Sequence, residues 1–197
     1  MSAAQRTTHL LYLHGFRSSP LSTKAQTMAA WMREHRPDVV WCCPQLPPSP
    51  REAIEQLDRI MAAWPAAGRA VIGSSLGGFY ATVLAQRFGC RAVLLNPAVS
   101  PARDLASQIG EHSQWHGGAS FRFEPRYIEE LRQMTPPEIS APERCFAILA
   151  KGDEVLDWRE MQARYRGCRV ELLEGGDHAL SDFDTHLPAI VAFLGLA

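Results

Sequence analysis

The sequence predicts an α/β fold with a doubly wound, mostly parallel sheet of about six strands. Short apolar runs alternate with longer amphipathic stretches, which is the pattern of successive strand–helix–strand units. Ser, Asp or Pro opens several of the amphipathic stretches, as is typical of helix N-termini. The 197 residues and the 46% hydrophobic content suit one hydrophobic core. We therefore expect a single domain over residues 1–197.

The apolar runs are the expected strands, and each is short enough to cross a buried sheet once. They lie at residues 9–13, 39–43, 70–73, 92–96, 145–150 and 169–173. The amphipathic stretches are the expected helices. They lie at residues 22–35, 50–64, 75–88, 157–166 and 181–196. Six strands with intervening helices predict helices on both faces of the sheet.

Two segments interrupt this alternation. Residues 44–50 are rich in proline and cannot continue a strand or a helix interior. We expect a stiff surface loop there, and the alternative is a loop that borders a pocket. Residues 97–143 separate two strands and contain a short helical pattern at 126–134. Because so long a connection in a compact domain is usually functional, we expect a lid-like insertion over the site.

The overall composition excludes some classes of partner. Lys and Arg number 20 against 21 Asp and Glu, and the net charge is -1, so no broad positive field attracts nucleic acid or an anionic membrane. The apolar run at residues 10–13 is too short for a signal-peptide core or a membrane span, so we expect a cytoplasmic protein. The five cysteines are odd in number and lack Cys-x-x-Cys spacing, which favours reduced, buried thiols. No feature of the sequence indicates an oligomeric state.

Residues 70–81 carry the strongest chemical signal. An apolar strand runs into Gly73-Ser74-Ser75-Leu76-Gly77 and then into a helix, which is the context of a nucleophile elbow. Glycines around Ser75 allow the sharp reversal that exposes its hydroxyl. Ser74 falls one position early for this spacing. A bare pentapeptide of this kind also occurs by chance, but the flanking strand and helix favour Ser75 as the nucleophile.

A serine nucleophile requires a histidine base and a carboxylate that orients it, and on this type of fold they follow the serine in the order acid, histidine. His178 follows a Gly-Gly turn after the last expected strand, and it is the predicted base. Three acids, Asp153, Glu154 and Asp157, share the loop after the preceding strand. Asp153 directly follows Gly152 and is favoured, whereas Asp157 has the position of a helix cap. Asp177 adjoins the histidine in sequence, for which a surface role is expected.

Two backbone amides are predicted to bind the oxyanion. Leu76 begins the helix after the serine, where amides lack helical partners. Phe16 lies in the loop after the first strand, where Gly15 permits a tight turn. His14 is expected to brace this loop. Arg17 and Lys24 are candidates for attracting an acidic substrate group, although solvated side chains are the commoner explanation.

The remaining histidines carry no predicted chemistry. His112 and His116 share a spacing that places both on one helical face, as metal ligands require. No third ligand stands near them in the sequence. We therefore predict no metal and no cofactor, and the other histidines are expected to be packed or solvated.

Several motifs closely resemble those of the YqiA-like bacterial esterases, the UPF0227-type small α/β-hydrolases. They lie at residues 11–20, 44–48, 73–78, 96–98, 152–157 and 174–179, and the resemblance spans nearly the whole chain. It implies an α/β-hydrolase fold and a carboxylesterase active on acyl esters and acyl-CoA-type thioesters. It also implies catalytic roles for Ser75, Asp153 and His178. Residues 97–143 match least, so substrate preference does not carry over.

A small-molecule acyl ester or thioester is therefore the expected substrate. The same triad serves peptidases, lipases and thioesterases. A lipase would need a larger apolar lid, whereas the charged side chains in residues 97–143 favour soluble substrates. The alternative from another class is a catalytically silent binding protein on a hydrolase fold, since a fold alone does not establish activity.

Overall fold

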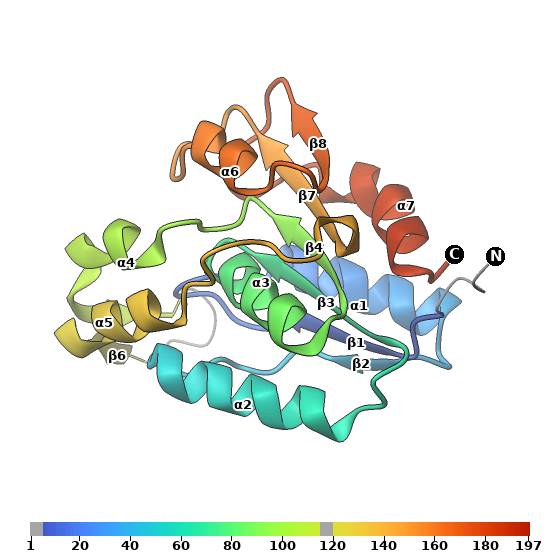
Figure 1. Ribbon diagram of the computed structural model, residues 1–197, viewed down its shortest axis with the longest axis horizontal. Coiled ribbons are helices and arrows are strands. Elements are labelled where there is room, and N and C mark those ends of the chain that lie inside the picture. Colours follow the sequence, from blue (N-terminus) through green and yellow to red (C-terminus); the bar gives the residue numbers. More distant parts are fainter. Residues whose placement is uncertain (1–5, 115–119) are drawn as a thin grey trace.

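The structure is a computed structural model that describes residues 6–114 and 120–197. It confirms the predicted fold, because a six-stranded parallel sheet lies between two layers of helices (Figure 1). The strand order is β2-β1-β3-β4-β7-β8. These strands are β1 (His9–Leu13), β2 (Val40–Cys42), β3 (Arg69–Ser74), β4 (Arg91–Leu95), β7 (Cys145–Ala150) and β8 (Arg169–Leu173). Every strand ends within one residue of its predicted limits.

The sheet is buried on both faces because its strands are apolar at successive positions. In β1, Leu10 and Tyr12 pack into one core, whereas Leu11 and Leu13 pack into the other. All four side chains are fully buried. A parallel sheet of this kind depends on helices to cover both faces, and the amphipathic segments provide them.

The helices form two layers. They are α1 (Thr23–His35), α2 (Pro50–Ala63), α3 (Leu76–Phe88), α6 (Trp158–Arg164) and α7 (Phe183–Leu194). Apolar residues of α2, α3 and α6 share one core with the sheet, and those of α1 and α7 share the other. In Figure 1, α2 and α3 accordingly lie in front of the strands and α1 lies behind them.

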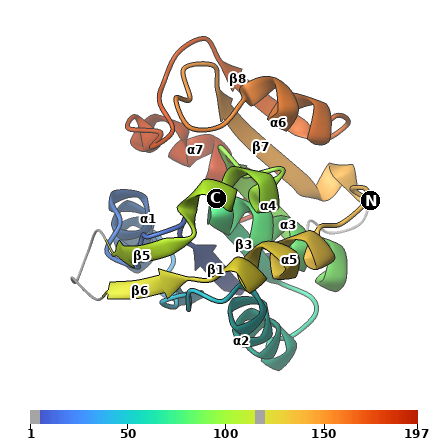
Figure 2. The same ribbon diagram turned by 90° about the vertical axis from the view of Figure 1, so that its left-hand side faces the viewer.

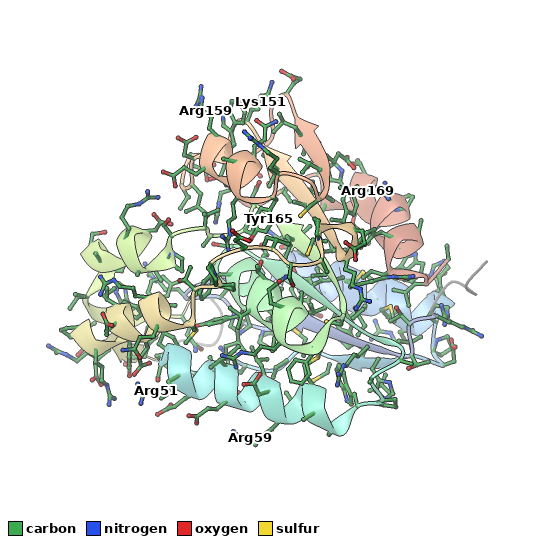
Figure 3. All side chains as sticks on the ribbon, viewed as in Figure 1. Arg51, Arg59, Lys151, Arg159, Tyr165 and Arg169 are labelled. Atoms are coloured by element: carbon green, nitrogen blue, oxygen red, sulfur yellow. The ribbon has the colours of Figure 1, made fainter. Side chains whose placement is uncertain are left out.

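Helix α2 shows how the sequence specifies one of these elements. Ser49 caps it by accepting a hydrogen bond from the amide of Glu52 (3.3 Å), and Pro50 occupies its first position. One face of the helix is buried. It carries Ala53, Ile54, Leu57 and Met61. Arg51 and Arg59 are exposed on the opposite side (Figure 3), as amphipathic periodicity requires.

The long insertion stands at the end of the molecule that Figure 2 turns toward the viewer. Its elements are α4 (Pro101–Asp104), the 3₁₀ turn η1 (Ala106–Gln108), β5 (Gly110–Ser113), β6 (Ser120–Phe123), α5 (Pro125–Met134) and the 3₁₀ turn η2 (Pro142–Arg144). Helix α5 confirms the helical pattern predicted at 126–134, and it packs against α2 and α4. Strands β5 and β6 form an antiparallel hairpin that the sequence did not predict.

The prediction of uniformly buried thiols is wrong for three of the five cysteines. Cys90 and Cys145 are buried, but Cys42, Cys43 and Cys168 are half-buried. These three lie in or beside β2 and β8, the two edge strands, where one side of the strand has no neighbour. All five are free thiols.

In the part of the chain that the structure describes, no helix is long and apolar enough to cross a membrane bilayer.

Candidate active site

The candidate nucleophile, Ser75, lies between β3 and α3 at the carboxyl end of the sheet. Its backbone has φ 57° and ψ −121°, a conformation that residues other than glycine rarely adopt. The Ser75 amide donates to the carbonyl of Leu95 (3.0 Å), and the Ser75 carbonyl accepts from the amides of Gly78 (2.9 Å) and Ala98 (3.0 Å). Because neighbouring segments make these bonds, the strained turn is held in place.

Gly73 and Gly77 lie so close to the backbone of neighbouring segments that no side chain fits at either position. A Cβ atom on Gly73 would overlap the backbone of Gly77, and a Cβ atom on Gly77 would overlap the backbone of Leu13 at the end of β1. Side chains at these positions would push β1, β3 and α3 apart. The glycines of the motif therefore allow these three elements to meet at Ser75.

His178 lies in the loop after β8 and contacts both other members of the predicted triad. Its Nε2 lies 3.0 Å from Ser75 Oγ, and its Nδ1 lies 2.7 Å from Asp153 Oδ2. An ionised carboxylate only accepts hydrogen bonds, so the imidazole proton lies on Nδ1 and Nε2 is the acceptor for the serine hydroxyl. The Asp153 side chain is 0% exposed and the imidazole 18%. The carboxylate is thus shielded from water, while one edge of the imidazole stays accessible.

Asp153 and Asp157 have different neighbours, although both follow β7. The second oxygen of Asp153, Oδ1, accepts hydrogen bonds from the amides of Val155 and Leu156, both at 2.8 Å. The Asp157 carboxylate instead caps α6 by accepting from the amide of Arg159 (2.9 Å). The structure therefore brings Asp153, and not Asp157, to the histidine.

Asp177, beside His178 in the chain, faces away from the imidazole. Its carboxylate accepts hydrogen bonds from the amide (2.9 Å) and the hydroxyl (2.6 Å) of Ser181. These hydrogen bonds hold the pKa of the Asp177 carboxyl below its usual value. This agrees with the surface role expected from the sequence.

Several contacts tie the acid loop to the histidine loop. The amides of Lys151 and Gly152 donate to the carbonyls of Leu173 (3.0 Å) and Gly175 (3.2 Å). The exposed Glu154 accepts a hydrogen bond from the amide of His178 itself (2.9 Å). The two loops are therefore one hydrogen-bonded unit.

Both predicted oxyanion donors line one pocket next to the serine. It is lined by the amide-bearing residues Phe16 and Leu76 and by side chains of the proline-rich loop, α3 and the insertion. Among the described residues, neither of these two amides has a hydrogen-bond acceptor. Gly15 lies beside Ser75: a Cβ atom built on this glycine would be 3.2 Å from Ser75 Cβ. Two free amides beside a nucleophile are suited to bind an oxyanion.

His14 braces the loop that carries Phe16, as the sequence predicts. Its Nε2 accepts a hydrogen bond from the amide of Leu46 (3.1 Å), and its Nδ1 lies 3.0 Å from the carbonyl of Gly15. Since Nε2 is an acceptor, the proton lies on Nδ1 and is donated to Gly15. His14 thereby joins the oxyanion loop to the proline-rich loop.

The proline-rich loop runs along the surface and also forms a wall of the pocket, which is the alternative that the sequence left open. Gln45, Leu46, Pro47 and Pro48 line the pocket. Leu46 and Ser49 are buried, because His14 and the insertion pack against them. The rigid prolines fix the shape of this wall.

The insertion reaches the oxyanion loop through aromatic contacts. The Phe16 ring packs edge-on against Phe121 and Phe123 of β6, with ring centroids 5.9 and 5.2 Å apart, and against His112 of β5 at 5.4 Å. Phe121 and Gln114 also line the pocket. The hairpin therefore covers the loop that presents the Phe16 amide.

The two cations considered for substrate binding make contacts within the protein. Lys24 donates to the carbonyl of Ala179, directly after His178, and burial lowers the pKa of its ammonium against the opposing effect of Asp177. Arg17 donates from Nε to the carbonyl of Ser113 (3.2 Å) and lines the pocket. Lys24 thus supports the histidine loop, and Arg17 joins the oxyanion loop to β5.

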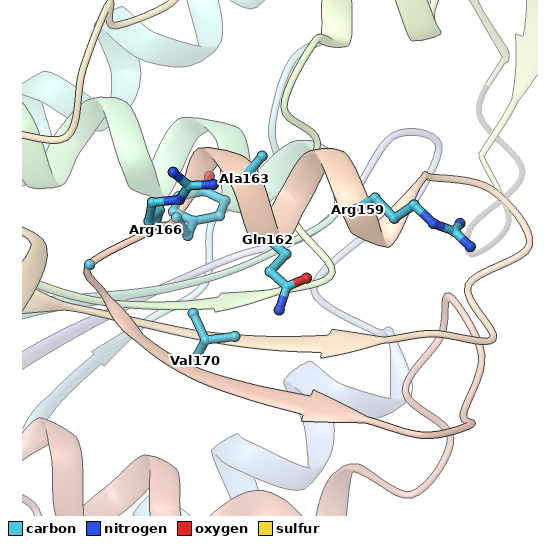
Figure 4. A pocket seen from close by; sticks show the side chains of 7 residues that line it. Arg159, Gln162, Ala163, Arg166 and Val170 are labelled. Carbon is cyan, nitrogen blue, oxygen red and sulfur yellow. The ribbon is translucent and has the colours of Figure 1, made fainter.

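A second hollow lies far from these residues, between α6 and the edge strand β8 (Figure 4). Its lining consists of Arg159, Gln162, Ala163, Tyr165, Arg166, Gly167 and Val170. The Tyr165 hydroxyl is engaged with Thr82 (2.8 Å). This hollow contains no serine, histidine or carboxylate, so it has no groups for acyl transfer.

The predicted residues Ser75, Asp153, His178, Phe16 and Leu76 are all brought to this one end of the sheet. The metal interpretation of His112 and His116 is not tested, because residue 116 lies outside the described residues. Within those residues, no group of three potential metal ligands occurs.

Two supporting residues were not singled out from the sequence. Asn96 is fully buried after β4, and Glu154 had been considered only as an alternative acid. The signal that could have revealed Asn96 is an asparagine as the last residue of a predicted strand, because asparagine tolerates a left-handed backbone better than other residues with side chains.

Comparison with known families places the chain in one of them over nearly its full length. The model of the uncharacterised protein family UPF0227 matches residues 9–195. A UPF0227 protein of Serratia proteamaculans is 24% identical over 189 residues, which cover 93% of this chain and 97% of that protein. A UPF0227 protein of Yersinia enterocolitica is also 24% identical, with the same coverage.

Comparison with solved structures identifies the fold. Mouse alpha/beta hydrolase domain-containing protein 10 superposes with a TM-score of 0.70 at 14% identity, covering 96% of this chain and 90% of that one. A chain of the metagenome-derived lipolytic enzymes LipS and LipT gives 0.72 at 17% identity, covering 98% and 95%. The esterase domain of a Rhodothermus marinus protein gives 0.65 at 20% identity, covering 98% and 87%. At these identities the similarity shows the α/β-hydrolase fold.

Proposed function

The chain belongs to the UPF0227 family, and from this premise we propose that it is a serine hydrolase that cleaves small-molecule carboxylic esters and acyl-CoA-type thioesters. One observation carries the proposal. An unbroken hydrogen-bonded chain runs from the buried Asp153 carboxylate through His178 to Ser75 Oγ, and Ser75 stands in a strained turn beside two free amides. This combination of groups is suited to acyl transfer through a serine nucleophile.

The first half of the proposed reaction acylates the serine. His178 Nε2 takes the proton of Ser75 as Oγ attacks the acyl carbonyl carbon. Asp153 holds the imidazole and stabilises the imidazolium that forms. The amides of Phe16 and Leu76 donate to the oxyanion. The tetrahedral intermediate then collapses, and the C–O or C–S bond to the leaving group breaks as His178 protonates the alcohol or thiol.

The second half regenerates the enzyme by the same steps with water as the nucleophile. His178 removes a proton from water, the resulting hydroxyl attacks the acyl-enzyme, and the carboxylic acid leaves as the proton returns to Ser75 Oγ. The partial exposure of the His178 imidazole (18%) supports this step, because water must reach the ring.

The pocket supports a soluble substrate of modest size. Its walls combine apolar groups of Leu46, Phe121 and the prolines with the polar side chains of Gln45 and Gln114. The hairpin of the insertion also carries charged side chains. Arg122 pairs with Glu111 (3.1 Å), and both are largely exposed. A lipid-facing lid would present apolar groups at these positions.

Replacement of Ser75 by Ala tests the proposal. We expect the kcat for a p-nitrophenyl acyl ester to fall by at least about 10⁴-fold, since the nucleophile is lost. A fluorophosphonate should label the wild type rapidly and Ser75→Ala not at all. Ser74→Ala is the matched control in the same turn, and it should keep both activity and labelling.

The competing function is that of a silent binding protein on the hydrolase fold. It would be established by a folded wild type that neither reacts with the fluorophosphonate nor turns over any ester or acyl-CoA in a short-to-long acyl series. Turnover that survives in Ser75→Ala would reject the assignment of the nucleophile.

A further inference from the structure

Asn96 occupies the junction of the three loops that carry the triad. It follows β4, is 0% exposed and has φ 40°, in the left-handed region. Its neighbour Leu95 accepts the hydrogen bond of the Ser75 amide. Its own side chain reaches the other two loops: Oδ1 accepts from the amide of Ala150 at the end of β7 (2.8 Å), and Nδ2 donates to the carbonyls of Asp177 (2.9 Å) and His178 (3.3 Å).

Glu154 contacts the same backbone from the opposite direction. Its Oε2 accepts the hydrogen bond of the His178 amide (2.9 Å). The peptide group between Asp177 and His178 therefore donates to Glu154 and accepts from Asn96, and the next carbonyl, that of His178, also accepts from Asn96. Both peptide groups of the histidine are held by side chains from other loops.

We propose that Asn96 and Glu154 are positioning residues that clamp the backbone of His178 and thereby fix its imidazole between Ser75 and Asp153. The inference rests on the proposed function, because it assigns these residues a role in that reaction. Neither residue touches the reacting atoms, and they act through the position of the histidine.

The segment just before His178 does little by itself to fix its backbone, so contacts from other elements, Asn96 and Glu154 among them, have to hold the loop. Residues Glu174, Gly175 and Gly176 before it are exposed, and Gly176 has φ 82°. Two successive glycines allow many backbone conformations. The Ser75–His178 contact depends on the placement of this loop, and a shift of about 1 Å in a catalytic group reduces rate by about 10²-fold.

Position 96 requires a left-handed backbone and a side chain that both donates and accepts hydrogen bonds, and asparagine provides both. It tolerates the left-handed backbone better than other residues with side chains. Its amide also offers a donor to one loop and an acceptor to another. The Asn96 side chain and its bond to the Ala150 amide are buried, so an unpaired group there would be costly. Aspartate keeps the backbone tolerance and the acceptor but lacks the Nδ2 donor.

The Asn96→Asp variant replaces that donor by an oxygen, which repels the carbonyls of Asp177 and His178. We expect kcat for a p-nitrophenyl ester to fall by about 10- to 100-fold and KM to stay within about twofold, because the histidine moves while the pocket does not. The rate of fluorophosphonate labelling should fall by the same factor as kcat. Thr82→Val is the matched control: it removes a buried hydroxyl bonded to Tyr165 (2.8 Å) outside the site, and it should lower the Tm without changing kcat.

Glu154 gives a second test on an exposed side chain, where folding is not at risk. Glu154→Ala removes the acceptor and should lower kcat by about 3- to 10-fold with KM unchanged. Glu154→Gln keeps an acceptor oxygen without the charge and should restore at least half of the kcat. An equal loss in both variants would indicate a charge effect and overturn the clamp.

A third measurement does not depend on turnover. The proton on His178 Nδ1, shared with Asp153, should give a low-field NMR signal in the wild type, in Thr82→Val and in Glu154→Gln. It should broaden or disappear in Asn96→Asp and Glu154→Ala. Folded variants with an unchanged signal and an unchanged kcat overturn the inference. A wild type that shows the signal but hydrolyses no ester refutes the proposed function, while the variants still decide whether the clamp exists.

Discussion

Asp153 and Asp157 are four residues apart in one loop, yet only one of them has its carboxylate beside an imidazole. Asp153 is enclosed: Oδ2 contacts His178, Oδ1 accepts two backbone amides, and the side chain is 0% exposed. Asp157 is exposed and caps α6. Identical side chains therefore have different contacts, one with the imidazole of His178 and one with the first turn of α6.

Substitution of each aspartate distinguishes the two roles. Asp153→Asn keeps an oxygen for the amides of Val155 and Leu156 but offers an NH₂ group to His178 Nδ1, so the imidazole must take the wrong tautomer. We expect kcat to fall by about 10⁴-fold with little change in Tm. Asp157→Ala should cost about 1 kcal/mol of unfolding free energy and leave kcat unchanged. Steady-state kinetics and urea unfolding measure both, and the reverse pattern would assign the acid to Asp157.

At this scale the sequence singled out the candidate triad, but it did not predict the contacts that hold the loops of the triad together. Ser75, Asp153 and His178 each follow a strand and belong to motifs whose spacing is local. The partners of Asn96 and Glu154 lie 81 and 24 residues away, respectively, in the chain. Contacts over such separations depend on which strands become neighbours, and the sequence pattern does not contain that information.

Among the elements, the insertion is the one least predictable from sequence. Strand β5 (Gly110–Ser113) is polar and lacks the alternation of a half-buried strand, and the four residues of β6 are too few for a periodic signal. The hairpin is ordered because Phe121 and Phe123 pack on Phe16. Phe16 precedes these two residues by about 100 positions in the chain. Tertiary contact here determines local structure, whereas α5 was predictable because its own apolar face is periodic.

Helix α5 is anchored to the body of the protein by a buried carboxylate. Glu130, only 8% exposed, accepts hydrogen bonds from the Ser49 hydroxyl and the Arg51 amide, both at 3.0 Å. These groups belong to the N-terminus of α2, where the helix dipole favours a negative charge. Ser49 directly follows the proline-rich pocket wall, so this contact connects the insertion to that wall.

We expect Glu130→Ala to weaken both stability and substrate binding. It leaves a buried hydroxyl and a helix amide without their acceptor, at a cost of about 1–3 kcal/mol. Displacement of the pocket wall should raise KM by about fivefold with a smaller change in kcat, because the triad is not touched. Glu129→Ala is the control on the same helix, since Glu129 is exposed and pairs only with surface groups. Equal Tm and KM values in Glu130→Ala and Glu129→Ala would show that Glu130 does not anchor α5.

For the whole molecule, the sequence predicted the layers but not the order of the strands. Continuous apolar runs such as Cys145–Ala150 can only be buried on both faces, which requires helices above and below the sheet. The strand order β2-β1-β3-β4-β7-β8 also depends on the edge of the growing sheet to which each helical crossover adds the next strand. The rule that crossovers are right-handed is compatible with several strand orders. Because all strands are parallel, every order places their carboxyl ends together, and this is why the site was predictable before the order was known.

The same burial makes the folded protein sensitive to alkaline pH. Burial raises the pKa of the Cys90 thiol to about 11 and that of Cys43 to about 12. An unfolded thiol ionises near pH 8.5, so above that pH the unfolded state releases protons that the folded state retains. The unfolding free energy therefore falls as pH rises from about 8.5 toward the folded-state values. For Cys90 the loss amounts to about 3 kcal/mol by pH 11.

Urea unfolding of Cys90→Ala between pH 8 and 10.5 tests this origin of the instability. The variant starts less stable at pH 8, because a methyl group fills less of the core than a thiol. Its unfolding free energy should nevertheless fall less steeply with pH than that of the wild type, since one thiol no longer titrates. Cys90→Ser should give the same reduced slope, because the serine hydroxyl does not ionise in this range. A slope equal to that of the wild type in both variants would assign the alkaline loss to other groups, first among them Cys43, whose unfolded thiol ionises in the same pH range.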